Sequence, residues 1–147
     1  MLKKLITALF LTFIMSLPVV AIEPPEGATV PFEGINQAYT ANQFNAVLEA
    51  YGLMLSPDAA KNVPSSFAKV DGDTIKFTEK SMAYTAGNYN TILTAYGLVL
   101  TSDNVSSLES IKAYASVKDD KVVFSDKPIA YKPEEWETIL GAYSKAM

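Results

Sequence analysis

The chain has 147 residues, with twelve lysines and sixteen acidic residues, and it contains no histidine, cysteine or arginine. The missing residue types exclude Ser-His-Asp and Cys-His catalysis, thiol redox chemistry, and zinc sites of the usual nitrogen and sulfur type within this chain. The acidic balance and the lack of arginine argue against a nucleic-acid partner, because phosphate recognition needs a basic surface.

Residues 1–21 are typical of a secretory signal peptide. Two lysines near the start precede an apolar stretch (5–15), a break at Pro18, and small or β-branched residues up to Ala21. We expect cleavage after Ala21, so that the chain meets a membrane only transiently, through this segment. The alternative is an uncleaved anchor, because the stretch 5–22 is uncharged and roughly long enough to span a bilayer. A secreted chain of this size without disulfides suits the periplasm or exterior of a bacterium.

Three segments of fifteen residues, 38–52, 83–97 and 130–144, have nearly the same sequence, at spacings of 45 and 47 residues. A short Val-x-Phe or Ile-x-Phe pattern ends six residues before each segment. Self-similarity at a fixed period indicates a repeated structural unit. We therefore predict an internal repeat of about 45–47 residues, in which a strand leads into a helix.

Each repeated segment predicts a helix with defined ends. Thr40 opens a Thr-x-x-Gln capping box, and Thr85 occupies the same place in the second copy. Pro133 takes the first helical position of the third copy. Gly52 and Gly97 end the first two helices in the left-handed conformation. An aromatic pair at the start of each copy forms a hydrophobic staple, and an apolar stripe follows (Phe44, Val47, Leu48, Tyr51; Tyr89, Ile92, Leu93, Tyr96; Trp136, Ile139, Leu140, Tyr143).

The stretches between these helices predict short second helices, near 57–62 and 102–110, and β-hairpins at 67–77 and 114–124. The order β-α-α-β, β-α-α-β, β-α amounts to two and a half copies. We expect an α+β fold with a mostly antiparallel sheet and helices packed on one face. It would form one domain, residues 30–147, after a flexible lead at 22–29.

The outward face of the first two helices is polar but almost uncharged, unlike a usual solvated helix face. Uncharged amides cost less to desolvate than charges, so this face is a candidate docking surface. The candidate binding residues are Asn42, Asn45, Glu49, Asn88, Asn90 and Thr94. We assign no catalytic, metal or cofactor-binding residue, and we expect no cofactor.

Other residues allow competing interpretations. The aromatic residues could stack on sugars, although their positions match staples and a buried stripe. The acidic stretches 71–73 and 118–121 suit hairpin turns better than calcium loops. Glu134 and Glu137 could act as a catalytic acid and base. A serine (Ser66, Ser81 or Ser125) could meet a lysine in space, but no motif supports this pair.

The leading hypothesis is an exported, non-catalytic binding or scaffold module. Its partner would be another envelope or secreted protein, or a second copy of the chain through an exposed edge strand. One alternative is a carbohydrate or small-ligand binding protein of the envelope. Another is a small hydrolase or an enzyme inhibitor.

Overall fold

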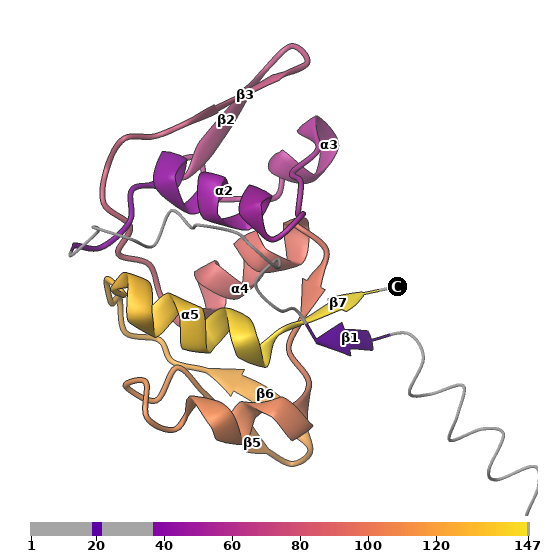
Figure 1. The fold of residues 1–147 in the computed structure, drawn as a ribbon, viewed down its shortest axis with the longest axis vertical. Helices are drawn as coiled ribbons and strands as arrows, with labels where there is room; N and C mark the ends of the chain where they lie inside the picture. Colours follow the sequence, from indigo (N-terminus) through magenta and orange to yellow (C-terminus); the bar gives the residue numbers. More distant parts are fainter. Residues whose placement is uncertain (1–18, 22–36, 147) are drawn as a thin grey trace, which may run out of the picture.

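The computed structural model describes residues 19–21 and 37–146 (Figure 1). Most of the expected signal peptide, the lead at 22–29 and the first expected strand therefore lie outside the described residues. The helices are α2 (Ala41–Ala50), α3 (Pro57–Ala60), α4 (Ala86–Ala95), the 3-10 helix η1 (Ser102–Leu108) and α5 (Pro133–Ala142). The strands are β1 (Val19–Ala21), β2 (Ala68–Asp71), β3 (Thr74–Phe77), β4 (Leu98–Val99), β5 (Ala115–Lys118), β6 (Lys121–Phe124) and β7 (Ser144–Ala146). Helices and antiparallel strands are mixed, which confirms the α+β class.

The three long helices begin as predicted. The Thr40 side chain accepts a hydrogen bond from the Gln43 backbone N–H, and the Thr40 backbone N–H donates one to the Gln43 side-chain oxygen, which completes the capping box. Thr85 caps α4 through the Asn88 backbone, and Pro133 opens α5. All three staples form, with ring centroids 6.5 Å (Tyr39–Phe44), 5.5 Å (Tyr84–Tyr89) and 5.5 Å apart (Tyr131–Trp136).

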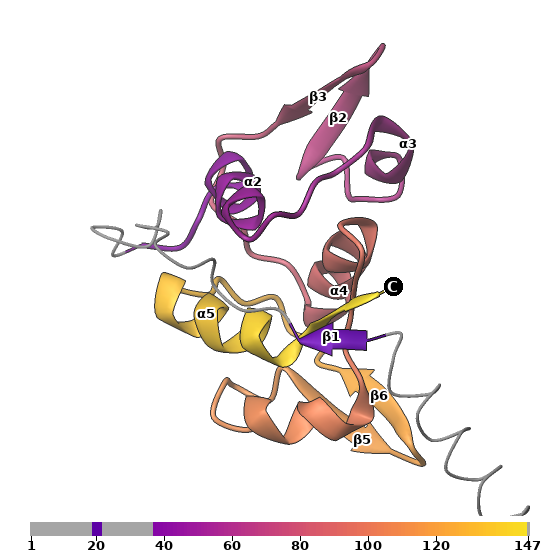
Figure 2. The same cartoon turned by 45° about the vertical axis from the view of Figure 1, so that its right-hand side comes forward.

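The staple aromatics of the three helices meet in one core. The ring of Trp136 on α5 lies 4.5 Å from that of Phe44 on α2 and 4.8 Å from that of Tyr89 on α4. These three side chains are buried, as are the other predicted stripe residues. Figure 2 shows α2, α4 and α5 between the two hairpins, which lie at opposite ends of the molecule. Burial of the three stripes against one another holds this arrangement together.

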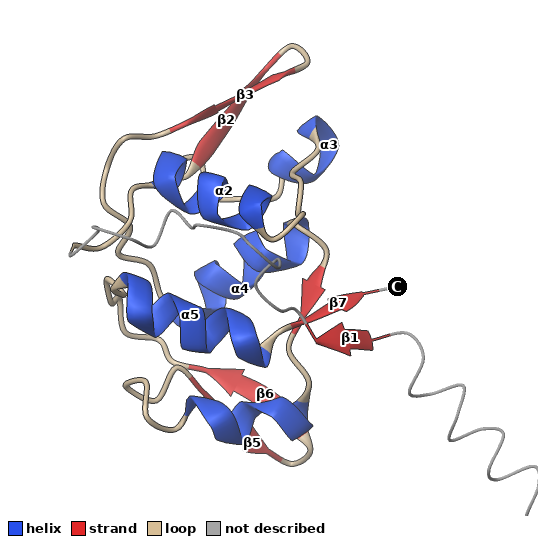
Figure 3. Cartoon of the chain, viewed as in Figure 1, coloured by secondary structure: helices blue, strands red, loops and turns tan. Residues whose placement is uncertain are grey.

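The strands differ from the expected single layer. They form three separate sheets, the hairpins β2–β3 and β5–β6 and the three-stranded sheet β1-β7-β4 (Figure 3). Both predicted hairpins form, with Val70 opposite Ile75 in the first and Val117 opposite Val122 in the second. The chain that leaves each hairpin makes only isolated bridges before it enters the next helix, Ser81 with Thr40 and Tyr84 with Ile129, and the two hairpins remain separate sheets.

Two further expectations are corrected in detail. The second helices are shorter than predicted: α3 is one turn, and η1 has the 3-10 geometry. Tyr143, expected inside the last helix, instead has an extended backbone after α5, and the chain continues into β7. No helix of the described residues is both long enough and apolar enough to cross a bilayer.

Candidate functional site

Two of the candidate asparagines are tied to the core by tyrosine hydroxyls. Asn45 Oδ1 accepts a hydrogen bond of 2.6 Å from Tyr96, and Asn90 Oδ1 accepts one of 2.9 Å from Tyr143. Each bond joins a helix to the residue that ends the next long helix. Asn45 and Asn90 are half-buried, so they connect the packed interior to the surface rather than lying on it freely.

The tyrosine behind Asn90 belongs to a longer chain of hydrogen bonds. The hydroxyls of Tyr143 and Tyr114 lie 2.8 Å apart, and both side chains are fully buried. Burial raises the pKa of the Tyr114 hydroxyl well above its ordinary value, and the neighbouring Tyr143 adds to that shift. Burial, with a smaller effect of Glu135, raises the pKa of Tyr131 to about 12. These hydroxyls therefore remain neutral at physiological pH.

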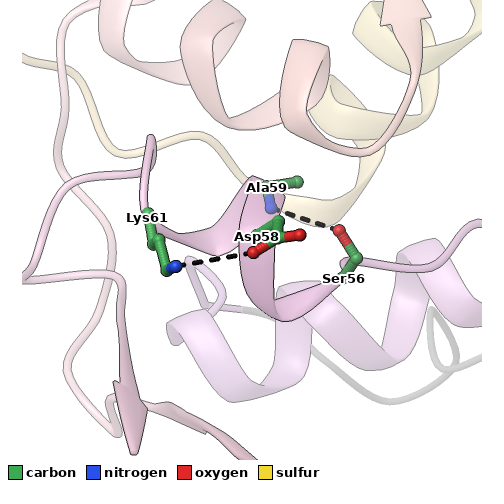
Figure 4. Close-up of polar contacts among 4 residues, drawn as sticks. All are labelled: Ser56, Asp58, Ala59 and Lys61. Atoms are coloured by element: carbon green, nitrogen blue, oxygen red, sulfur yellow. Dashed lines mark hydrogen bonds and ion pairs between the residues drawn. The ribbon is translucent and has the colours of Figure 1, made fainter. Parts of the chain in front are cut away.

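Asn90 and Thr94 line a groove of about 500 Å³ between α3 and α4, here called the amide groove. Its lining residues are Ala59, Asn62, Asn90, Thr91, Thr94 and Ala95, none of which is charged. The Ala59 backbone donates a 3.1 Å hydrogen bond to the capping Ser56 hydroxyl, and Lys61 pairs with Asp58 at 3.4 Å (Figure 4). These contacts fix the single turn of α3 that forms one wall of the groove.

Asn45 and Glu49 line a second groove of about 330 Å³, here called the acidic groove. It lies between the end of α2, the loop that follows and strand β3. Its lining includes Asn45, Glu49, Met54, Asp73, Ile75 and Phe77, and Glu49 and Asp73 are the only charged lining residues in the described part of the chain. Asn45 donates a hydrogen bond of 3.2 Å to Glu49, which orients that carboxylate.

Four of the six candidate residues thus divide between the two grooves, Asn45 and Glu49 in the acidic groove and Asn90 and Thr94 in the amide groove. Asn42 and Asn88 are exposed and line neither groove. Sequence reasoning missed Asn62, which follows α3, and Asp73, which lies in a hairpin turn. One signal could have indicated the buried contacts of the asparagines: a buried tyrosine hydroxyl requires a polar partner, and Tyr96 and Tyr143 end the apolar stripes.

The residues behind the competing interpretations have ordinary structural surroundings. Apart from the half-buried Tyr84, the staple and stripe rings are buried, while Glu134 and Glu137 are exposed on α5. Asp71 pairs with Lys76 at 3.0 Å beside the first hairpin turn. The Ser66 hydroxyl lies 2.9 Å from that of Tyr84.

Within the described residues, no three His, Cys, Asp or Glu side chains gather in a group that could hold a metal ion. Comparisons of the chain with protein families, curated proteins and solved structures found no match.

Proposed function

We propose that the chain is an exported, non-catalytic binding module that recognises another envelope or secreted protein through the amide groove. It would consist of repeat units of about 45–47 residues, two complete and one half. The staples and the asparagine–tyrosine bonds, which recur at this spacing, support the repeat. The single observation that carries the function is the uncharged lining of the amide groove, in which amide and hydroxyl groups lie beside alanine methyl groups.

The chemistry of this lining favours an extended, uncharged segment of a partner. Amide and hydroxyl groups lose less on desolvation than charged groups, and they can bond to the peptide groups of a bound chain. The methyl groups of Ala59 and Ala95 let a backbone approach closely. A volume of about 500 Å³ lies within the usual range of ligand sites, and here it suits a few residues of a loop.

The test compares two matched threonines. Thr91 lines the amide groove and donates a 3.1 Å hydrogen bond to the Gly87 carbonyl, and Thr138 on α5 makes the same bond to Glu134 at 3.3 Å. Both are exposed. We expect Thr91→Lys to abolish capture of the partner by cross-linking in the native host, and Thr138→Lys to leave capture intact. Thermal unfolding should be the same for both variants. Equal capture by both would reject the amide groove as the binding site.

The proposed export has its own test. The expected cut follows Ala21, the last residue of β1, so cleavage would remove β1 from its pairing with β7. We expect the N-terminal sequence of the exported protein to begin at Ile22. Its intact mass should equal that of residues 22–147. Recovery of a membrane-bound chain that still begins at Met1 would favour the anchor instead.

A further inference from the structure

The acidic groove differs chemically from the amide groove and is open to a different ligand. Its two carboxylates, Glu49 and Asp73, come from α2 and from the β2–β3 turn, which are separate elements brought together by the fold. The two salt bridges of the described residues join Lys61 to Asp58 and Lys76 to Asp71. Neither lysine lines the groove, and no other lysine of the described residues does, so the described lining carries negative charge without a cation.

An exposed apolar side chain borders these carboxylates. Met54 is 81% exposed, the most exposed of the large hydrophobic residues described. It lines the groove together with Ile75 and Phe77, which are half-buried and pack against the core. Methionine is flexible and polarisable, and it often serves binding surfaces that adapt to a partner. A large apolar group held in water beside other apolar groups is stabilised when a partner covers it.

We propose that the acidic groove binds a segment of a partner protein in which a lysine or arginine adjoins an apolar residue. The cation lies between the Glu49 and Asp73 carboxylates, and its methylene stem runs along Met54. The neighbouring apolar side chain packs against Ile75 and Phe77. The charge of the groove selects this occupant over an acidic or uncharged segment, because a like charge in the groove would be repelled. This inference goes beyond the proposed function, because it assigns a second site with its own chemistry.

The experiment uses a defined probe, the peptide acetyl-Gly-Leu-Lys-Leu-Gly-amide, and its control with glutamate in place of lysine. The full mature chain is labelled with ¹⁵N, and amide chemical shifts are followed during titration. We expect shifts at Glu49, Met54, Asp73 and Ile75 with the lysine peptide, weakened by added salt, and none with the glutamate peptide. Equal shifts with both peptides, or no shifts at these residues at millimolar concentration, would overturn the proposal.

Variants separate the contribution of charge from that of shape. Glu49→Gln with Asp73→Asn removes both charges but keeps oxygen acceptors at both positions, and we expect about tenfold weaker binding, which corresponds to about 1.4 kcal/mol. Asp120→Asn is the matched control, because Asp120 occupies the turn of the second hairpin. It should bind like the unchanged chain. Undiminished binding by the double variant would refute the assigned role of the carboxylates.

Two more variants test the role of Met54 and the independence of the two grooves. Met54→Ser alters a side chain that is mostly in water, so it should fold normally and still bind several-fold more weakly. Unchanged binding would remove Met54 from the site. Thr91→Lys in the amide groove should leave the lysine peptide bound as before. Peptide binding therefore tests the acidic groove independently of the proposed function, which is tested by partner capture through the amide groove.

Discussion

Tyr143 donates a 2.9 Å hydrogen bond to Asn90, 53 residues earlier in the chain, and its hydroxyl also lies 2.8 Å from that of Tyr114. Tyr96 bonds to Asn45 in the same manner, at 2.6 Å. The polar face of α2 and α4 is therefore anchored from within the core. Asparagine at positions 45 and 90 therefore contributes to the packing of the helices, because each accepts a hydrogen bond from a buried tyrosine.

The first prediction concerns the shared hydroxyl of Tyr143. Tyr143→Phe should lower the free energy of unfolding by about 1–3 kcal/mol, because it takes away the hydroxyl that Tyr114 contacts inside the core. Tyr114→Phe should cost less, because Tyr143 keeps its bond to Asn90. Urea denaturation of the two single variants and the double variant measures these costs.

The double variant tests whether the two hydroxyls depend on each other. Tyr143→Phe with Tyr114→Phe should cost less than the sum of the two single changes, by about 1 kcal/mol, since neither hydroxyl of this pair is then left without the other. Additive costs would show that the two groups act independently.

The second prediction concerns alkaline pH. Burial raises the pKa of seven tyrosine hydroxyls above the ordinary value of 10 (Tyr39, Tyr51, Tyr89, Tyr96, Tyr114, Tyr131 and Tyr143). A raised folded-state pKa means that the unfolded chain releases these protons first. Stability should therefore be fully present below pH 10 and should fall as the pH rises through 10 toward 12 and beyond, by about 1.4 kcal/mol per pH unit for each ionising group.

Tyrosinate absorbance and circular dichroism, recorded together during an alkaline titration, check this expectation. Ionisation of the buried tyrosines should coincide with loss of the folded signal. The Tyr114→Phe, Tyr143→Phe double variant should show a shallower dependence of stability on pH. Ionisation of all the tyrosines near pH 10 with the folded signal intact would contradict the assignment.

The parts of the fold that were predictable are those with local causes. Thr40, Pro133 and Gly52 act within one or two turns of their own helix, so their effects can be recognised from spacing alone. Sheet β1-β7-β4 has no such cause. Leu98 pairs with Lys145 and Val99 with Ser144, and a strand of two residues has no recognisable period of its own.

The difference between local and long-range causes also explains which features of the candidate site were predictable from the sequence. The outward direction of Asn45 and Asn90 follows from helical periodicity, and they are indeed only half-buried. Their tyrosine partners lie 51 and 53 residues away, so those bonds depend on how the helices pack. Asp73 approaches Glu49 for the same reason, through the fold of a hairpin onto α2, which no spacing between the two residues expresses.

The third prediction concerns the helix caps. Thr40→Ala and Thr85→Ala should each cost about 1 kcal/mol, because each removes the acceptor of an otherwise unpaired backbone N–H at the start of a helix. Thermal denaturation measures the loss. Thr138→Ala is the control, since Thr138 lies inside α5 and is exposed, and it should change stability very little. Equal effects at all three threonines would indicate that the caps contribute nothing specific.

The last prediction contrasts two glycines that have the same open surroundings. A Cβ atom added at Gly97 or at Gly141 would meet nothing within 4 Å, so neither substitution creates a steric clash. Gly97 has a φ of +89°, which ends α4 in a conformation that other residues adopt at a cost, whereas Gly141 lies within α5. Gly97→Ala should therefore destabilise the protein by about 1–2 kcal/mol. Gly141→Ala should stabilise it by up to about 1 kcal/mol, because alanine favours the helix. Urea denaturation of both variants gives the signs, and a stabilising Gly97→Ala would show that α4 does not end at this left-handed residue.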